Sequence, residues 1–197
     1  MAGIKYLWVH RAHFQFGTRE FYRAWGKRLF TFPEMIRSNF RRLKLVKRGA
    51  AISETAEIGK LTADGPKANL TIGSNTFIGK VKMALHDQII IGEKVCINDG
   101  VIILTASHDV YGAEWKHVKR KIIIDDYVWI GTGAIILPGV HIGRGCVVGA
   151  GAVVSKSLPP GVIAVGNPAS YLNKKRPEEL TYNPCNLLAA NRAWLTG

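Results

Sequence analysis

The chain has 197 residues, which is enough for one domain with extensions and a sizeable buried core. Its three cysteines stand far apart without metal-ligand spacing, which argues against a disulfide-stapled secreted domain and for a reducing compartment. No run has the length of a membrane span, and the charged N-terminus lacks the apolar core of a secretory signal. We therefore expect a cytoplasmic protein.

Most of the net charge of +13 lies in residues 1–50, which hold twelve Lys and Arg against two Asp and Glu. The segment is also rich in aromatic residues, and its pattern predicts one or two short amphipathic helices broken at Pro33. It can cap the open end of a repeat fold, or lie on an anionic membrane surface, here the inner membrane face, and the two roles are compatible. Nucleic acid is not predicted as a partner, because no recognised binding motif accompanies the charge.

The middle of the chain, residues 51–170, repeats an aliphatic residue at every sixth position, with breaks of register at 62–69, near 89–91 and at 107–121. Six is the period of neither a helix nor a strand, and a short fixed period is typical of a solenoid. Three units of a short strand and a corner would make one turn, so the segment has room for roughly five to six turns around a narrow aliphatic core. The repeated positions are Ile52, Ile58, Ile72, Ile78, Ala84, Ile91, Ile97, Ile103, Ile124, Ile130, Ile136, Ile142, Val148 and Val154.

The repeat is interrupted most strongly at 107–121, "SHDVYGAEWKHVKRK". A loop that leaves a regular coil is where functional residues tend to lie. After the repeats, residues 171–197 form a C-terminal tail; within it, residues 177–197 are predicted to form a short helical segment that closes the C-terminal end, with Trp194 as its anchor.

The motifs "SHD", "VWIG", "PGVHIG", "VVGAGAVVSK", "LPPG" and "GNPA" resemble those of the hexapeptide-repeat acyltransferases. Within that family the chain most resembles the O-acetyltransferases of bacterial polysaccharide synthesis, such as the colanic acid enzymes, and then the maltose and galactoside acetyltransferases. The resemblance implies an all-β solenoid in the form of a left-handed parallel β-helix. It also implies a homotrimer with active sites between subunits, acetyl-CoA as co-substrate and no required metal.

Acetyl transfer from a thioester to a hydroxyl needs a base that titrates near neutral pH, which favours histidine. His108 stands where the coil is interrupted and matches the family's position for the catalytic base. We predict that it deprotonates the acceptor hydroxyl, which attacks the thioester directly; His117 is the alternative, and His86 is ambiguous. The group that orients His108 stays open among a backbone carbonyl and the side chains of Asp87, Asn98, Asp99 and Asp109.

The resemblance also assigns residues to the acetyl-CoA site. Trp129 and Thr132 would lie beside the cofactor arm, and Ala150 would let the pantetheine pass close to the backbone. The phosphate-bearing end would meet Ser155, Lys156, Lys174 and Lys175. A solvated helix start is an equal interpretation of "NKKRPEE", and the nearby glycines can simply form corners.

The acceptor is predicted to be a sugar or a lipid-linked glycan. Tyr111 and Trp115 are apolar plates of the kind that stack on sugar rings, although packing against the coil is an equal alternative for Trp115. Asp87, Asn98 and Asp99 are further candidates for contact with the acceptor.

Three other functions share parts of this pattern. N-acetylation of an amino sugar, including a nucleotide sugar, would use the same base and cofactor cleft. A zinc carbonic anhydrase on the same fold is disfavoured, because its ligand histidines lie closer in sequence than His108 and His117. A non-catalytic scaffold is disfavoured by the retained His108 and motif series.

Overall fold

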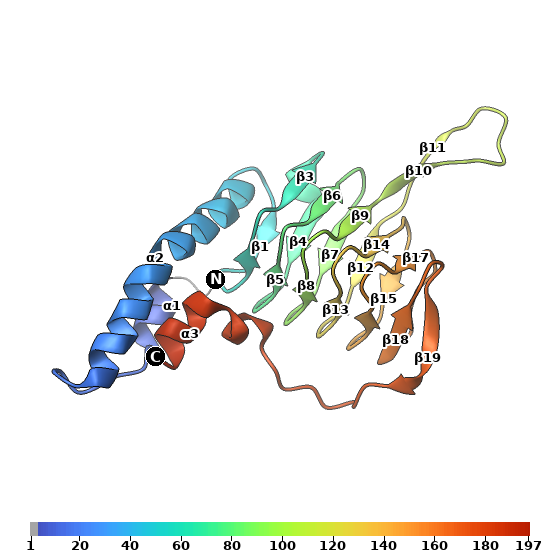
Figure 1. Ribbon diagram of the computed structural model, residues 1–197. Helices are drawn as coiled ribbons and strands as arrows, with labels where there is room; N and C mark the ends of the chain where they lie inside the picture. The colour runs from blue at the N-terminus through green and yellow to red at the C-terminus, as the bar shows by residue number, and fades with distance from the viewer. Residues whose placement is uncertain (1–3) are drawn as a thin grey trace.

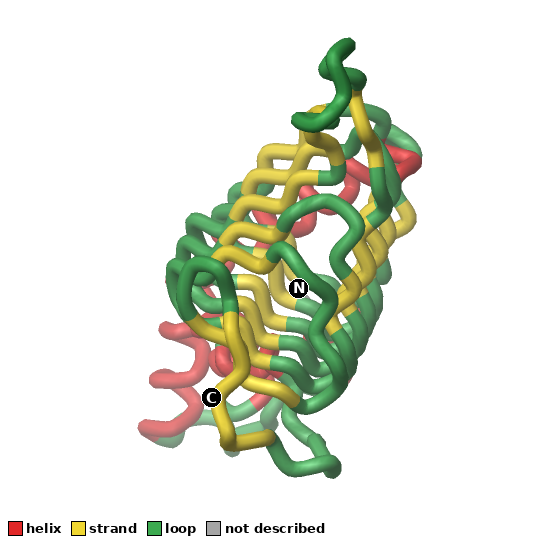
Figure 2. The backbone as a smooth tube through the Cα atoms, turned by 90° about the vertical axis from the view of Figure 1, so that its right-hand side faces the viewer, coloured by secondary structure: helices red, strands yellow, loops and turns green. Residues whose placement is uncertain are grey.

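The computed structural model describes residues 4–197 and shows a parallel β-solenoid with helices packed at its first turn (Figure 1). Five complete turns and part of a sixth stack along one axis, which confirms the predicted solenoid and its size. Viewed from the side of the last turns, the stacked strands and corners form parallel rows (Figure 2).

Each turn contributes one strand to each of three parallel sheets, named here A, B and C. Sheet A contains β1 (Ala51–Ile52), β4 (Leu70–Ile72), β7 (Ile89–Ile91), β12 (Ile122–Ile124) and β15 (His141–Ile142). Sheet B contains β2 (Glu57–Ile58), β5 (Phe77–Ile78), β8 (Cys96–Ile97), β13 (Trp129–Ile130), β16 (Val147–Val148) and β18 (Val162–Val165), with β19 (Ser170–Lys175) antiparallel at its edge. Sheet C contains β3 (Thr62–Asp64), β6 (Lys82–Ala84), β9 (Ile102–Leu104), β14 (Ile135–Ile136) and β17 (Val153–Val154). A single 3-10 turn, η1 (Lys67–Asn69), precedes β4.

The predicted aliphatic row fills the core, with one correction in the second turn. Equivalent residues of successive turns stand in register, so Ile97 and Ile130 are neighbours in sheet B and both are fully buried. In sheet C, however, Met83 and not Ala84 points inward, in register with Ile103. The corner before β6 is one residue shorter than six-residue spacing requires. The inward position of β6 therefore falls one residue earlier in the sequence, on Met83.

The predicted excursion is a β-hairpin between the third and fourth turns. Its strands β10 (Ala106–His108) and β11 (His117–Lys119) pair antiparallel and project away from the solenoid at the corner between sheets C and A (Figure 1). The polypeptide then re-enters the coil at β12, which pairs with β7 in the regular parallel register of sheet A.

The N-terminal segment forms α1 (Ile4–Val9) and one long helix, α2 (Arg19–Val46). The prediction that Pro33 breaks the helix is wrong, since α2 continues through it. Residues on both sides of Pro33 are buried in the same packing surface, including Ala24 before it and Met35 after it. Pro33 leaves the carbonyl of Leu29 without its helical donor, and Leu29 is an exposed residue, so water can replace that bond.

The sequence predicted that the C-terminal tail closes the C-terminal end of the solenoid, and this prediction is wrong. Instead the tail leaves β19 and runs back along the solenoid through η2 (Pro184–Leu187) to α3 (Ala189–Leu195), which packs on α2 (Figure 1). Trp194 is buried and anchors the tail, as expected, but it does so against Leu7 and Met35 at the opposite end. The guanidinium of Arg28, also buried, donates hydrogen bonds to the backbone oxygens of Ala193 and Trp194.

Within residues 4–197 no helix has the length and apolar content needed to cross a bilayer. Large apolar side chains nevertheless lie exposed on α1 and α2, among them Trp8, Phe30 and Phe40. Contact of this segment with a membrane surface therefore stays a prediction.

Truncation of one inward side chain tests the core. Ile124 is buried between Ile91 and Ile142, whereas its neighbour Ile123 points outward and is half-buried. We expect Ile124→Ala to lower the free energy of unfolding by about 2–5 kcal/mol, because it removes buried methyl groups and leaves a cavity. The measurement is denaturant unfolding followed by circular dichroism. Ile123→Ala is the matched control and should lower the free energy of unfolding clearly less. Equal decreases in the two variants would contradict the assigned register.

Candidate active site

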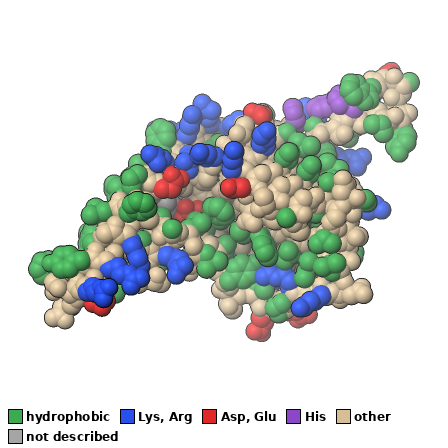
Figure 3. Space-filling view, viewed as in Figure 1, with side chains coloured by type: hydrophobic (Ala, Val, Ile, Leu, Met, Phe, Trp, Pro, Cys, Tyr) green, Lys and Arg blue, Asp and Glu red, His purple; other side chains and the backbone are tan. Residues whose placement is uncertain are grey.

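The hairpin root and the corners beside it enclose a cavity of about 440 Å³. His108, Tyr111 and Arg120 line it from the hairpin, and Leu137 and Ser155 line it from the next two corners of the solenoid. A group of histidine side chains lies at the base of the hairpin in the space-filling view (Figure 3). Of the predicted site residues, the structure thus brings His108, Tyr111 and Ser155 together.

His108 is held by the hairpin's own backbone. Its Nδ1 lies 2.9 Å from the carbonyl oxygen of Trp115, which can only accept a hydrogen bond. Nδ1 must therefore carry the proton in the neutral ring, and Nε2 keeps a free lone pair. This geometry answers the question of orientation left open by the sequence, in favour of a backbone carbonyl.

Trp115 contributes its ring as well as its carbonyl to this arrangement. The ring stacks on His108 with centroids 3.9 Å apart and planes 16° from parallel. Trp115 has φ of 47°, in the left-handed region that bulky residues rarely adopt. That unusual conformation places the ring and the carbonyl of one residue against the same imidazole. The sequence singled out Trp115 as a plate for sugar, and the structure gives it a contact with the proposed base.

The acidic side chains that the sequence offered to orient His108 form hydrogen bonds with other groups. Asp109 accepts hydrogen bonds from the backbone N–H groups of Tyr111 and Gly112, so it fixes the hairpin tip. Asp87 accepts from the N–H of Gln88, at the corner before the hairpin root. None of these hydrogen bonds involves His108.

Two more histidines stand beside His108. His117 lies directly across the hairpin, with ring centroids 5.3 Å apart, and His86 from the preceding turn packs edge-on against His117. Loss of solvation, together with the positive charges of Lys119, His108 and His86, lowers the pKa of His117. No three His, Cys, Asp or Glu side chains among residues 4–197 are arranged to hold a metal ion.

Several other residues predicted for the cofactor and the acceptor lie on other parts of the solenoid. Thr132 and Asp99 line a cavity at the corner between sheets B and C, and Ala150 follows Gly149 at the equivalent corner one turn later. The Asp99 carboxylate accepts a hydrogen bond from the N–H of Lys80, 2.7 Å away, so it caps the corner of the preceding turn. Within one chain these residues are separated from His108 by the width of sheet C.

Trp129 of sheet B and Asn98, directly after β8, line a cavity of about 360 Å³ under the C-terminal tail. Cys96 lines the same cavity, and burial raises the pKa of its thiol to about 11. The thiol is therefore protonated near neutral pH and unsuited to nucleophilic catalysis.

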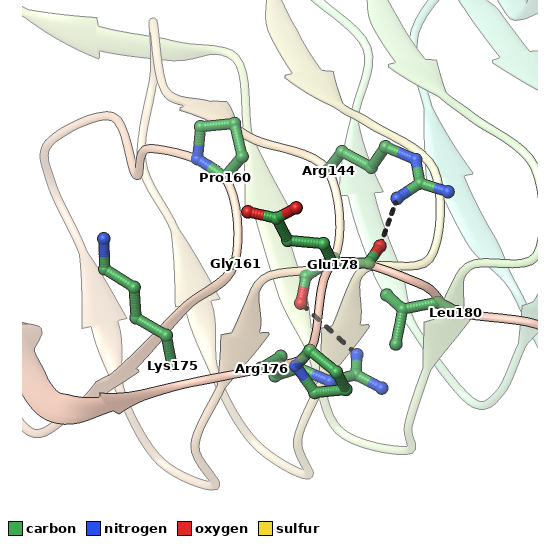
Figure 4. Close-up of a pocket in the computed structure, with 9 residues that line it drawn as sticks. Arg144, Pro160, Gly161, Lys175, Arg176, Glu178 and Leu180 are labelled. Carbon is green, nitrogen blue, oxygen red and sulfur yellow. Dashed lines mark hydrogen bonds between the residues drawn. The ribbon is translucent and has the colours of Figure 1, made fainter.

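Lys174 and Lys175 lie in β19, not in a helix start. Lys175 lines a cavity of about 320 Å³ between sheets A and B, together with Arg144 and Arg176 (Figure 4). Arg176 donates to the carbonyl of Gly145, and Glu178 brings a carboxylate into the same cavity. Lys156 is exposed beside Ser155. The predicted cofactor residues therefore occupy several edges of one chain.

Removal of one nearby cation tests the electrostatics of the histidine cluster. We expect His117 to titrate below the ordinary histidine value, and Lys119→Gln to raise its pKa part of the way back, because one of several contributions is removed. Histidine proton NMR across pH 5–8 measures this. Lys121→Gln is the control, and an unchanged pKa of His117 in Lys119→Gln would contradict the described arrangement.

Comparison with known proteins places this geometry among related chains. The family model for bacterial transferase hexapeptides (six repeats) matches residues 121–156. The galactoside O-acetyltransferase of Escherichia coli K12 is 34% identical over 139 residues, covering 65% of this chain and 68% of that protein. That of Lactococcus lactis is 39% identical over 93 residues, covering 44% of each chain. Across five curated relatives the chain spans between 44% and 70% of their length.

A solved structure agrees along most of the chain. The hexapeptide-repeat containing acetyltransferase of Vibrio cholerae, determined with acetyl coenzyme A, has a TM-score of 0.64 and 26% identity, covering 84% of this chain and 94% of that one. The repeats, the register of their core and these similarities agree. The chain belongs to the hexapeptide-repeat transferase family.

Proposed function

We propose that the protein is an acetyl-CoA-dependent O-acetyltransferase whose acceptor is a hydroxyl of a sugar or glycan. The observation that carries the proposal is the hydrogen bond from His108 Nδ1 to the Trp115 carbonyl, which leaves Nε2 as a free base beside a cavity. The names of the galactoside O-acetyltransferase relatives support the reaction and the class of acceptor. The acetyl coenzyme A complex of the Vibrio cholerae protein supports the donor.

Acetyl-CoA would supply the acetyl group as a thioester, and the residues of this chain would manage one proton. His108 takes the proton of the acceptor hydroxyl at Nε2 as the hydroxyl oxygen forms its bond to the acetyl carbon. When the carbon–sulfur bond breaks, the imidazolium returns that proton to the departing thiolate. The Trp115 carbonyl favours the required tautomer before the step and accepts from the charged ring during it.

We further propose that the active site is completed by a second copy of the chain in a homotrimer. One chain by itself leaves Thr132 and Ala150 on a different edge from His108, so a neighbouring subunit is needed to bring both groups to one cleft. An apolar outer surface on sheet C supports this proposal. The outward side chains of its last three strands are half-buried and aliphatic, namely Ile102, Leu104, Ile135 and Val153.

The catalytic role of His108 is tested by thiol release from acetyl-CoA against a panel of sugars and nucleotide sugars. We expect His108→Ala to reduce kcat by about 10²–10⁴-fold, because the general base is lost. His141→Ala is a matched control, since His141 is an exposed histidine paired with Asp125 on sheet A. Equal activity of His108→Ala and the wild type would transfer the role to His117 or His86.

The assembly is tested by disrupting the outer surface of sheet C. We expect Ile135→Arg to dissociate the trimer and abolish turnover while the chains stay folded, because a charge would be placed in an apolar contact. Light scattering, circular dichroism and thiol release on the same samples measure the three properties. An active monomer would refute the shared site.

A further inference from the structure

The corner between sheets B and C carries a second functional feature, away from His108. A cavity of about 750 Å³ runs along it, and three lysines line it: Lys60 in the first turn, and Lys80 and Lys82 in the second. Thr132 and Asp99 line its far end. We call this cavity the lysine groove. Lys and Arg side chains gather over the first turns of the solenoid in Figure 3.

The solenoid repeat forces the first two of these charges together. Thr62 of β3 is in register with Lys82 of β6, so Lys60 and Lys80, each two residues earlier, occupy equivalent positions in adjacent turns. Adjacent parallel strands lie about 4.8 Å apart. Like charges at directly neighbouring positions repel one another, and this repulsion is an unfavourable contribution to stability.

None of the three lysines forms an ion pair in the described structure. The ion pairs among residues 4–197 join Arg or Lys to Glu34 and Glu114, and His141 to Asp125, and none includes a lysine of the groove. Asp99 is the one carboxylate lining the groove; its Oδ1 accepts from the N–H of Lys80, and its single negative charge offsets only one of the three positive charges. The groove therefore concentrates positive charge at a concave surface, which is the arrangement that attracts an anion.

The groove is connected to the proposed active site by a single strand. Ile102 lines the groove at the start of β9, and β9 leads directly into the hairpin that carries His108. Six residues of extended chain separate Ile102 from His108, a span of about 20 Å. Because sheet C is the proposed subunit contact, the acceptor would not cross it; Thr132, at the far end of the groove, would instead meet His108 of the partner subunit in the shared cleft.

We propose that the lysine groove binds an anionic group of the acceptor, either the phosphate of a nucleotide- or lipid-linked sugar or the carboxylate of an acidic glycan. This proposal rests on the proposed acetyltransferase function and adds the chemical class of its acceptor. The donor is the less suitable occupant. The residues assigned to its phosphate end follow β17 in the fifth turn or lie in β19, whereas Lys60 lies in the first turn; they are Ser155, Lys156, Lys174 and Lys175.

The kinetic test replaces all three lysines by glutamine and compares acceptors. For K60Q/K80Q/K82Q we expect KM for anionic acceptors to rise at least about tenfold, because charge-assisted hydrogen bonds are lost. KM for acetyl-CoA and turnover of a neutral galactoside should stay unchanged. K5Q/K44Q/K47Q is the matched control, since it removes the same charge from exposed lysines on or beside α1 and α2. A rise in KM for acetyl-CoA alone, or no change with any acceptor, would overturn the proposal.

A binding measurement separates this proposal from the function on which it rests. Isothermal titration of the wild type and K60Q/K80Q/K82Q would use inorganic pyrophosphate as the phosphate probe and a galacturonate oligomer as the carboxylate probe. If no acceptor is turned over, but the wild type binds one probe and the triple variant does not, the acetyltransferase function fails and the anion groove stands. Binding of neither probe by the wild type would overturn the groove. Loss of the pyrophosphate signal favours a phosphate, and loss of the oligomer signal favours a carboxylate.

Discussion

The structure depends on one constraint, the inward stacking of aliphatic side chains from the strands of the three parallel sheets. Ile97, Ile130 and Val148 repeat in sheet B at the spacing of hydrogen-bonded strands, and each is fully buried. These buried side chains fill the narrow interior of the solenoid. Binding and chemistry are therefore confined to corners, outer faces and insertions, where the sequence can change without disturbing the row.

The hairpin exploits this freedom. It leaves the coil after β9 and returns in register at β12, so its length and contents do not affect the stacking on either side. Its residues position one another through hydrogen bonds. Asp109 accepts from two backbone N–H groups and fixes the tip, and the carbonyl of Trp115 fixes the imidazole of His108. A proton-accepting nitrogen is thereby oriented without a buried carboxylate, which would have needed its own compensating partners.

How far the sequence predicted the structure depended on whether neighbours or distant segments determined each element. The solenoid and its inward row followed from the six-residue period, and the hairpin from the interruption of that period. The prediction of a helix break at Pro33 was wrong because it rested on a local rule, whereas burial of Ala24 and Met35 against distant segments stabilises α2. The predicted position of the tail was wrong for the same reason, since nothing near Trp194 in the sequence indicates Leu7 as its neighbour. The orienting carbonyl of Trp115 carries no side-chain signature, so no motif could have identified it.

The path of the tail has a consequence for how the molecule unfolds. In a solenoid each turn contacts only its neighbours, so end turns normally fray independently and stability resembles a sum along the axis. Here the segment after β19 returns to α2, and the Arg28 guanidinium binds the backbone of Ala193 and Trp194. The last turn is thus tied to the first through one continuous strap. Loosening either end disturbs the other, which turns a one-dimensional array into a closed cooperative unit.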